Sequence, residues 1–364
     1  MELRRRNFLG ADKAGGIYGV EWDGSSSSVM TRTDDAAGFS NPNPYYAGMS
    51  GSPSSPFDTL SPWKDMERVE DAEAGSLVKI PKFWFKWTRS GSSMKLQISP
   101  SKQDGFLVSP AHADRGDGNG ERDFVYVGRY HCSTNNYKSV SGVKPKVSIT
   151  RGTARTNIAN LGSDVWQLDY AMLWTVNMLY LVEFANWDSQ ATIGYGCGNN
   201  SATENSGKTD SMPYHTGTMA NSRTTYATGI QYRYIEDWWA NVLDWVDGIY
   251  FSSSNVYNIN DPSKFSDSTN GVNTGKRTTS SGYIKTWSEP SIAGYEYAIY
   301  PNAVNGSTQS YVNDRCYYTS SGVVLYFGGY YNGQSQSFGA FYLDGHVGSS
   351  SSYSDIGCRL QKLP

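Results

Sequence analysis

The chain has 364 residues, which is long enough for one large domain or two ordinary ones with a substantial buried core. Only 18% of the residues are charged, 14% are aromatic and 38 are glycine, a composition that argues against intrinsic disorder and favours many short strands over a helical bundle. A net charge of −3 excludes general electrostatic attraction to nucleic acid, so we expect no nucleic-acid partner.

The first 74 residues are predicted to form a small segment rich in strands and loops. Residues 17–22 read Ile-Tyr-Gly-Val-Glu-Trp, a short strand pattern that ends at an Asp-Gly turn. Proline and serine clusters at 41–44 and 50–56 predict an irregular loop. We assign 1–74 to attachment and oligomerisation. No apolar stretch follows the arginine-rich start, so no secretory signal peptide is expected.

Beyond this segment, three stretches have the alternation of apolar and polar residues that is typical of strands. They lie at 77–87, 94–98 and 124–130. The first contains Pro81, which predicts an edge strand or a bent one. From Ile249 onward, short strands and polar turns are expected to predominate as far as Pro364.

Two helices are predicted. Residues 168–184 are apolar on nearly every side, which indicates a helix buried between other elements, and a shorter helix at 156–161 ends at Gly162. Polar interruptions make the longer one unsuitable for spanning a bilayer, so no membrane insertion is expected. The aromatic run at 236–248 fits either a third short helix or a tight turn around 240–241.

The titratable residues give no pattern typical of an active site. Four cysteines stand apart without the paired spacing of a zinc centre, which favours free, buried thiols. The loop at 114–121 lacks the full pattern of a calcium loop and is expected to be solvated. The sequence leaves open whether a calcium ion binds. With four scattered histidines, the chain is predicted not to be an enzyme and to need no cofactor.

Tyrosines are concentrated near the C-terminus: eleven of the 27 lie between 295 and 353, among Ser, Gly and Asn. Tyrosine offers a large, rigid contact area and the small polar residues add adaptable hydrogen bonding, as on a recognition surface. We expect six of them to be exposed for want of aliphatic neighbours, namely Tyr317, Tyr318, Tyr330, Tyr331, Tyr342 and Tyr353, whereas Trp238, Trp239 and Trp245 are expected in the core. The predicted ligand-binding residues are Tyr311, Asn313, Tyr317, Tyr318, Tyr326, Tyr330, Tyr331, Ser337, Phe338, Tyr342, Asp344, His346 and Tyr353.

Residues 232–248 resemble the core motif of the formylglycine-generating-enzyme-like branch of the C-type lectin fold, with Ala240 where the motif usually has glycine. The predicted helix at 168–183 and the closing stretch 355–360 are similar to features of that family. The resemblance covers 75–364 and implies an α+β, C-type lectin-like fold: a twisted antiparallel sheet with two helices, preceded by the small N-terminal segment.

A narrower resemblance is to variable proteins that retroelements diversify in gut phages and prophages. It rests on the patterns at 1–6, 17–24, 80–85 and 109–112. It implies a variable region at about 307–355, a place at the virion tail tip, and recognition of a host cell-surface protein or glycan. It also implies contacts with a phage tail or sister subunits, as a homo-oligomer and specifically a homotrimer.

Two other functions are weighed against receptor binding. The wider resemblance implies a copper-dependent thiol oxidase of the formylglycine-generating type, but Cys316 and Cys358 are separated by 41 residues rather than paired closely. A structural tail or baseplate protein that is not diversified would instead use the tyrosines as subunit contacts.

Overall fold

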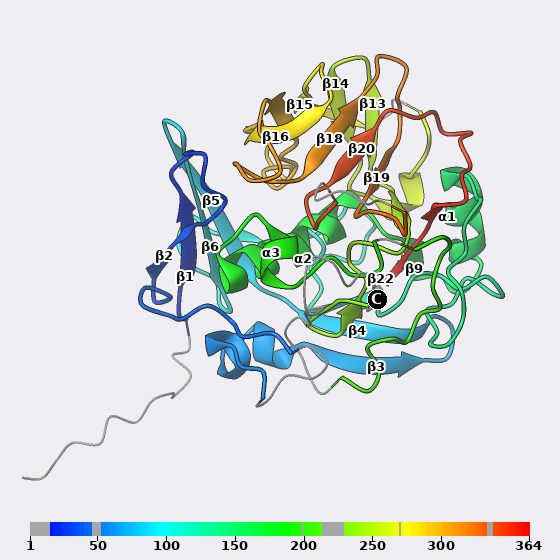
Figure 1. The fold of residues 1–364 in the computed structure, drawn as a ribbon, viewed down its shortest axis with the longest axis horizontal. Helices are drawn as coiled ribbons and strands as arrows, with labels where there is room; N and C mark the ends of the chain where they lie inside the picture. Colours follow the sequence, from blue (N-terminus) through cyan, green and yellow to red (C-terminus); the bar gives the residue numbers. More distant parts are fainter. Residues whose placement is uncertain (1–14, 46–51, 199, 213–228, 269–270, 333–337) are drawn as a thin grey trace, which may run out of the picture.

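The computed structural model describes residues 15–45, 52–198, 200–212, 229–268, 271–332 and 338–364. Strands predominate, with 33% strand against 12% helix. The described residues form five sheets and three α-helices (Figure 1).

Two sheets of five strands are built mainly by the N-terminal third of the chain. The order in the first is β2 (Thr31–Asp34), β1 (Tyr18–Trp22), β6 (Ser93–Ser99), β5 (Trp84–Ser90) and β7 (Leu107–Val108). The order in the second is β3 (Glu67–Asp71), β4 (Gly75–Pro81), β8 (Phe124–Gly128), β22 (Leu360–Lys362) and β9 (Val165–Gln167). The last strand of the chain, β22, therefore belongs to the same sheet as β3 and β4 from the N-terminal third.

The C-terminal half forms the other three sheets. The largest, here called the seven-stranded sheet, has the order β17 (Pro301–Val304), β16 (Gly282–Trp287), β18 (Arg315–Tyr318), β20 (Leu343–Gly345), β19 (Leu325–Phe327), β12 (Leu243–Val246) and β21 (Ile356–Gly357). The smaller two are β13 (Ile249–Ser252), β14 (Asn255–Asn258) and β15 (Val272–Lys276), and the pair β10 (Gln231–Tyr232) and β11 (Ile235–Glu236).

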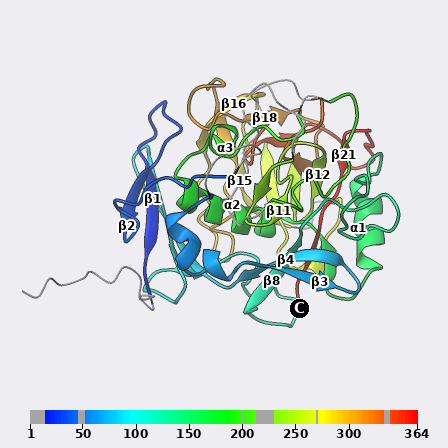
Figure 2. The same ribbon diagram turned by 60° about the horizontal axis from the view of Figure 1, so that its bottom comes forward.

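Helix α2 (Tyr170–Phe184) runs through the middle of the molecule, between the sheet that contains β1, the sheet that contains β4 and the seven-stranded sheet (Figures 1 and 2). The Asp169 carboxylate caps its start and Ala185, with φ of 50°, ends it. All fifteen of its residues are buried, which confirms the predicted buried helix.

The two other α-helices are short. Helix α1 (Arg151–Ala159) begins earlier than predicted because Thr150 caps it, and α3 (Ser189–Thr192) has a single turn. Three turns of 3₁₀ helix occur at Pro56–Thr59, Trp63–Asp65 and Pro262–Lys264. No helix among the described residues has the length and apolar character needed to cross a membrane.

The predicted C-type lectin-like α+β fold is wrong. Five sheets replace the single twisted sheet with two helices, and the chain is mostly strand. The predicted bent strand at 77–87 is two strands, β4 and β5, which belong to different sheets. Strand pairing also crosses the boundary placed at 74, because β1 pairs with β6 and β3 pairs with β4.

Residues 233–241, part of the segment 232–248 on which the resemblance rested, contain turns, and no third helix forms at 236–248, where β12 follows these turns. The backbone of 233–241 is left-handed at five non-glycine residues: Arg233, Tyr234, Asp237, Ala240 and Asn241. A right-handed helix cannot pass through such residues, so the alternative of a tight turn around 240–241 is confirmed. Ala240 has φ of 72°, a conformation in which glycine meets no Cβ penalty.

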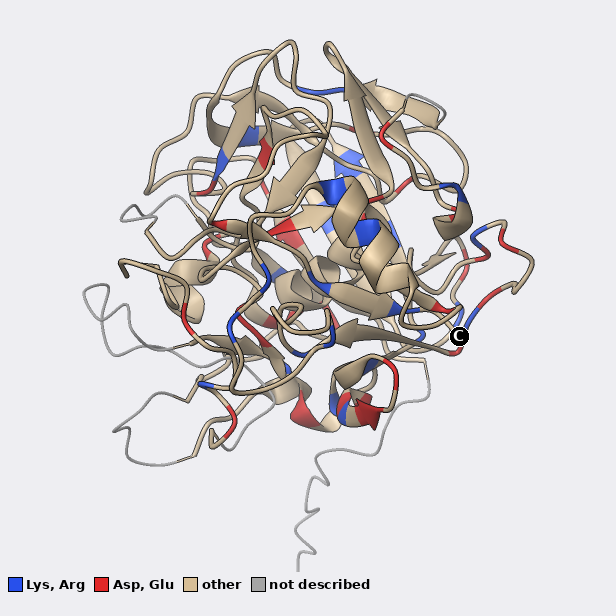
Figure 3. Cartoon of the chain, turned by 90° about the vertical axis from the view of Figure 1, so that its right-hand side faces the viewer, with Lys and Arg blue, Asp and Glu red and all other residues tan. Residues whose placement is uncertain are grey.

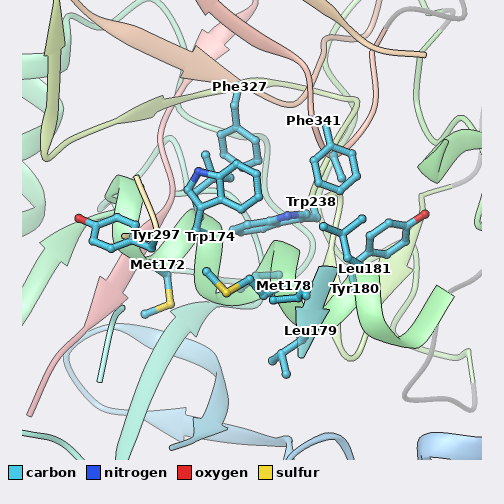
Figure 4. Packing of buried hydrophobic residues seen from close by; sticks show 14 of the residues in the cluster. Met172, Trp174, Met178, Leu179, Tyr180, Leu181, Trp238, Tyr297, Phe327 and Phe341 are labelled. Atoms are coloured by element: carbon cyan, nitrogen blue, oxygen red, sulfur yellow. The ribbon is translucent and has the colours of Figure 1, made fainter. Parts of the chain in front are cut away.

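Aromatic side chains fill the core around α2. Trp238, Trp239 and Trp245 are buried as predicted. Figure 4 shows Trp238, Phe327 and Phe341 packed over the side chains of α2. Acidic and basic segments are interspersed along the ribbon in Figure 3, as a net charge of −3 would lead one to expect.

Candidate ligand-binding site

A cavity of about 320 Å³ lies beside the seven-stranded sheet and is here called the tyrosine cavity. Eight of the thirteen predicted site residues line it: Tyr317, Tyr326, Tyr330, Phe338, Tyr342, Asp344, His346 and Tyr353. Leu243, Asp355 and Ile356 complete its lining. Residues that span 37 positions of the predicted variable region therefore meet at one place.

Strand register brings the central residues together. Asp344 on β20 pairs with Tyr317 on β18 on one side and with Tyr326 on β19 on the other. Paired residues on neighbouring strands project from the same face of a sheet, so the carboxylate lies between two phenol rings. Leu243 and Ile356 are paired in the same way on β12 and β21.

Each aromatic side chain in this part of the cavity wall contacts the next one along the wall. Ring centroids are 5.2 Å apart for Tyr330 and Phe338, 4.6 Å for Phe338 and Tyr342, and 6.0 Å for Tyr342 and Tyr317. Such tilted and edge-to-face pairs are favourable beyond the area that they bury. The rings therefore support one another, and Leu243, Val324, Val347 and Ile356 of the same buried cluster supply the aliphatic neighbours that the local sequence lacks.

Two of these tyrosines are buried. Tyr342 is only 3% exposed and Tyr326 only 4%, so the expectation that Tyr342 is exposed is wrong. The Tyr342 hydroxyl donates a hydrogen bond of 2.8 Å to Asp344, and burial raises the pKa of both phenols well above the usual range. Tyr353, by contrast, is 50% exposed at the opening.

Asp344 and His346 form a charge-assisted pair in the cavity. Nδ1 of His346 contacts the Asp344 carboxylate, the backbone N–H of His346 donates to it at 3.1 Å, and the Tyr326 hydroxyl lies 3.2 Å from Nδ1. The hydrogen bond to Asp344 raises the pKa of His346 above its ordinary value. Burial raises the pKa of the nearby Asp355 carboxyl.

A buried polar cluster lies under the strand that borders the cavity. Asp244 on β12 contacts Nδ1 of His131 at 3.0 Å and accepts a hydrogen bond of 3.2 Å from Nε of Arg359. Burial lowers the pKa of His131, which favours the neutral imidazole. This cluster fixes β12 and the segment after β21, and so positions Leu243 and Ile356.

Four predicted site residues lie outside the cavity. Tyr311 packs edge-on against Trp22 at 6.4 Å, and Asn313 is buried and donates to Asp188 at 2.9 Å. Tyr318 follows Tyr317 on β18 and lies under the Arg277 guanidinium, and Tyr331 adjoins Tyr330 without lining the cavity. The remaining one, Ser337, falls outside the described residues.

Sequence reasoning missed three lining residues: Leu243, Asp355 and Ile356. Leu243 and Ile356 are apolar, and Leu243 lies far upstream of the tyrosine-rich region in sequence. Asp355 carried a detectable signal, because it stands two residues after Tyr353 and directly before the apolar closing stretch. Alternation of that kind places both side chains on one side of an extended segment.

All four cysteines are buried and free, which confirms the prediction of free, buried thiols. Cys316 lies on β18 and Cys358 follows β21, which is four strand positions away or about 19 Å across a sheet. Burial raises the pKa of the Cys316 thiol to about 12. Two thiols so placed do not fit a shared copper ion.

The described residues contain a second cavity but no cluster of metal-binding side chains. A separate cavity of about 340 Å³ lies near Trp84, Phe106 and Tyr297, and no predicted site residue lines it. Within the described ranges, no group of three or more His, Cys, Asp or Glu residues is arranged to hold a metal ion.

Comparison with known proteins gives no family model that matches this chain and no similar curated protein. The functional argument therefore depends on the chain's own residues and on the short motifs described above.

Proposed function

We propose that this protein is a ligand-binding protein that recognises the surface of a host cell, with the tyrosine cavity as its recognition site. The setting proposed is the tail tip of a phage or prophage, where the chain would assemble with sister subunits. Several copies on one particle would raise the overall affinity even if each cavity binds weakly.

One observation carries this proposal: eight residues chosen from sequence for their recognition chemistry line a single cavity. Small-molecule sites are concave, largely aromatic or apolar, and carry a few convergent polar groups. The tyrosine cavity has six aromatic rings together with Asp344, His346 and Asp355. Groups with perturbed pKa values in a concave site, as His346 and Asp355 are, point to function.

Binding to intact cells tests the site. Labelled full-length protein should bind to cells of the host, and a Tyr330→Ala, Tyr353→Ala double variant should bind at least about tenfold more weakly, because each side chain contributes roughly 1–2 kcal/mol of contact. Tyr331→Ala is the matched control, since Tyr331 adjoins Tyr330 but does not line the cavity. Equal binding by all three proteins would contradict the proposal.

Sequence variation across a population tests the diversified setting. Sequencing this gene from many related phages or prophages should show substitutions concentrated at cavity positions such as Tyr317, Tyr330 and Tyr353. Val324, Leu325 and Ala340 are fully buried and should stay fixed, because volume changes in a packed core are costly. Sparse variation spread evenly along the chain would favour a fixed structural interface instead.

A further inference from the structure

Aromatic rings surround the tyrosine cavity at steep angles to one another. The interplanar angles are 71° for Tyr330 and Phe338, 57° for Phe338 and Tyr342, and 59° for Tyr342 and Tyr317. Rings set at such angles line a concave surface, whereas parallel rings would form a flat platform. Each π face carries partial negative charge, so a ring face turned toward this cavity attracts a positive charge.

Acidic groups reinforce that attraction. Asp344 and Asp355 both line the cavity, and none of the described lining residues is Lys or Arg. The guanidinium of Arg315 lies over the Tyr317 ring, 4.7 Å from its centroid, and does not line the cavity. His346 is the one lining group that can carry a positive charge, and it is already paired with Asp344.

We propose that the tyrosine cavity binds a quaternary ammonium group, of the trimethylammonium type found in choline, within the ligand that it recognises; this inference rests on the proposed function. A compact primary ammonium is strongly hydrated and needs several acceptors to replace its water, whereas a quaternary ammonium has no N–H group to satisfy. The cavity volume of about 320 Å³ suits a small group, being at the lower end of the roughly 300–1,000 Å³ of ligand pockets.

Titration calorimetry on the full-length protein tests this assignment with choline, tetramethylammonium and 3,3-dimethyl-1-butanol, the uncharged isostere of choline. Both cations should bind at least about tenfold more tightly than the isostere, because only they gain from the rings and the carboxylates. Tyr330→Ala should weaken choline binding about 3- to 30-fold. Tyr331→Ala should leave it unchanged.

Removing a carboxylate from the cavity, or lowering the pH, should weaken the binding of a cation but not that of a neutral ligand. Asp355→Asn should weaken choline binding several-fold without affecting the isostere. As the pH falls from 8 to 5, His346 gains a proton and Asp355, whose pKa is raised by burial, begins to gain one. The cavity then becomes less negative and choline binding should weaken. Burial raises the pKa of Tyr326, Tyr330 and Tyr342, so these phenols stay uncharged across this range, and Asp344 stays paired with His346.

The outcomes distinguish failure of this inference from failure of the proposed function. If choline binds no better than its isostere while the cell-binding loss on Tyr330→Ala and Tyr353→Ala persists, the cavity takes a neutral ligand such as a sugar and the inference is overturned. If those variants alter neither cell binding nor choline binding, the proposed function is overturned as well.

Discussion

Replacing Arg359 with methionine should lower the free energy of unfolding by about 3–5 kcal/mol, because the change leaves the buried Asp244 carboxylate without its guanidinium partner and with only the His131 imidazole beside it. The Arg359 side chain is fully buried. Its guanidinium donates to the Asp244 carboxylate and to four backbone carbonyls, at distances from 2.8 to 3.2 Å. Those carbonyls belong to residues 128–129 and 236–237.

The acceptors come from three separate parts of the chain, so one side chain ties β8, the 233–241 turns and β12 to the C-terminal segment. Arg359→Lys should recover only part of the lost free energy of unfolding, because a single ammonium cannot make the several hydrogen bonds that the planar guanidinium donates. Urea denaturation measures both changes. As a control, Lys264→Met removes the exposed ammonium that pairs with Asp261, whose carboxylate keeps its hydrogen bonds from Ser263, and should cost about 1 kcal/mol or less. A loss below that of the control would show that water replaces the guanidinium at little cost.

Replacing Trp174 with alanine should destabilise the protein by about 3–5 kcal/mol, the usual cost of deleting a large aromatic side chain from a core. Trp174 lies on α2 and is 1% exposed. Its ring meets those of Trp287, Trp87, Tyr170 and Phe341 at centroid separations of 5.5 to 6.5 Å. The variant would remove the shared contact at the centre of this group.

Thermal or urea unfolding should show Trp174→Phe to be much milder, because a smaller ring keeps some of these contacts. Tyr353→Ala is the comparison for a half-exposed ring and should cost less than about 1 kcal/mol. If Trp174→Ala and Tyr353→Ala shifted the unfolding midpoint equally, the packing around α2 would contribute far less than its burial indicates.

The burial of α2 and the strands at 94–98 and 124–130 could be predicted because their signals are local. A fifteen-residue segment that is apolar on every side has no stable position except the interior, and alternation marks a strand with one buried face. The concentration of tyrosine at 295–353 similarly indicated the part of the chain that supplies most of the lining of the tyrosine cavity.

The C-type lectin-like fold was wrong because it extended a short motif to the whole chain. The segment that carries the motif forms left-handed turns, and no residue pattern within it specifies how many sheets the remaining strands will build. The prediction that Tyr342 is exposed failed for a related reason, because it packs against aromatic residues of the same region in a buried cluster that also contains Leu243 from a distant segment.

The sequence alone determined a strand-rich chain with one buried helix, free thiols and a tyrosine-rich C-terminal region, because composition and short-range periodicity specify these features. Only the tertiary structure decided that Asp344 stands between Tyr317 and Tyr326, and that Arg359 meets carbonyls more than a hundred residues away. Strand order and register arise from the joint packing of distant segments, and no local stretch of sequence contains that information.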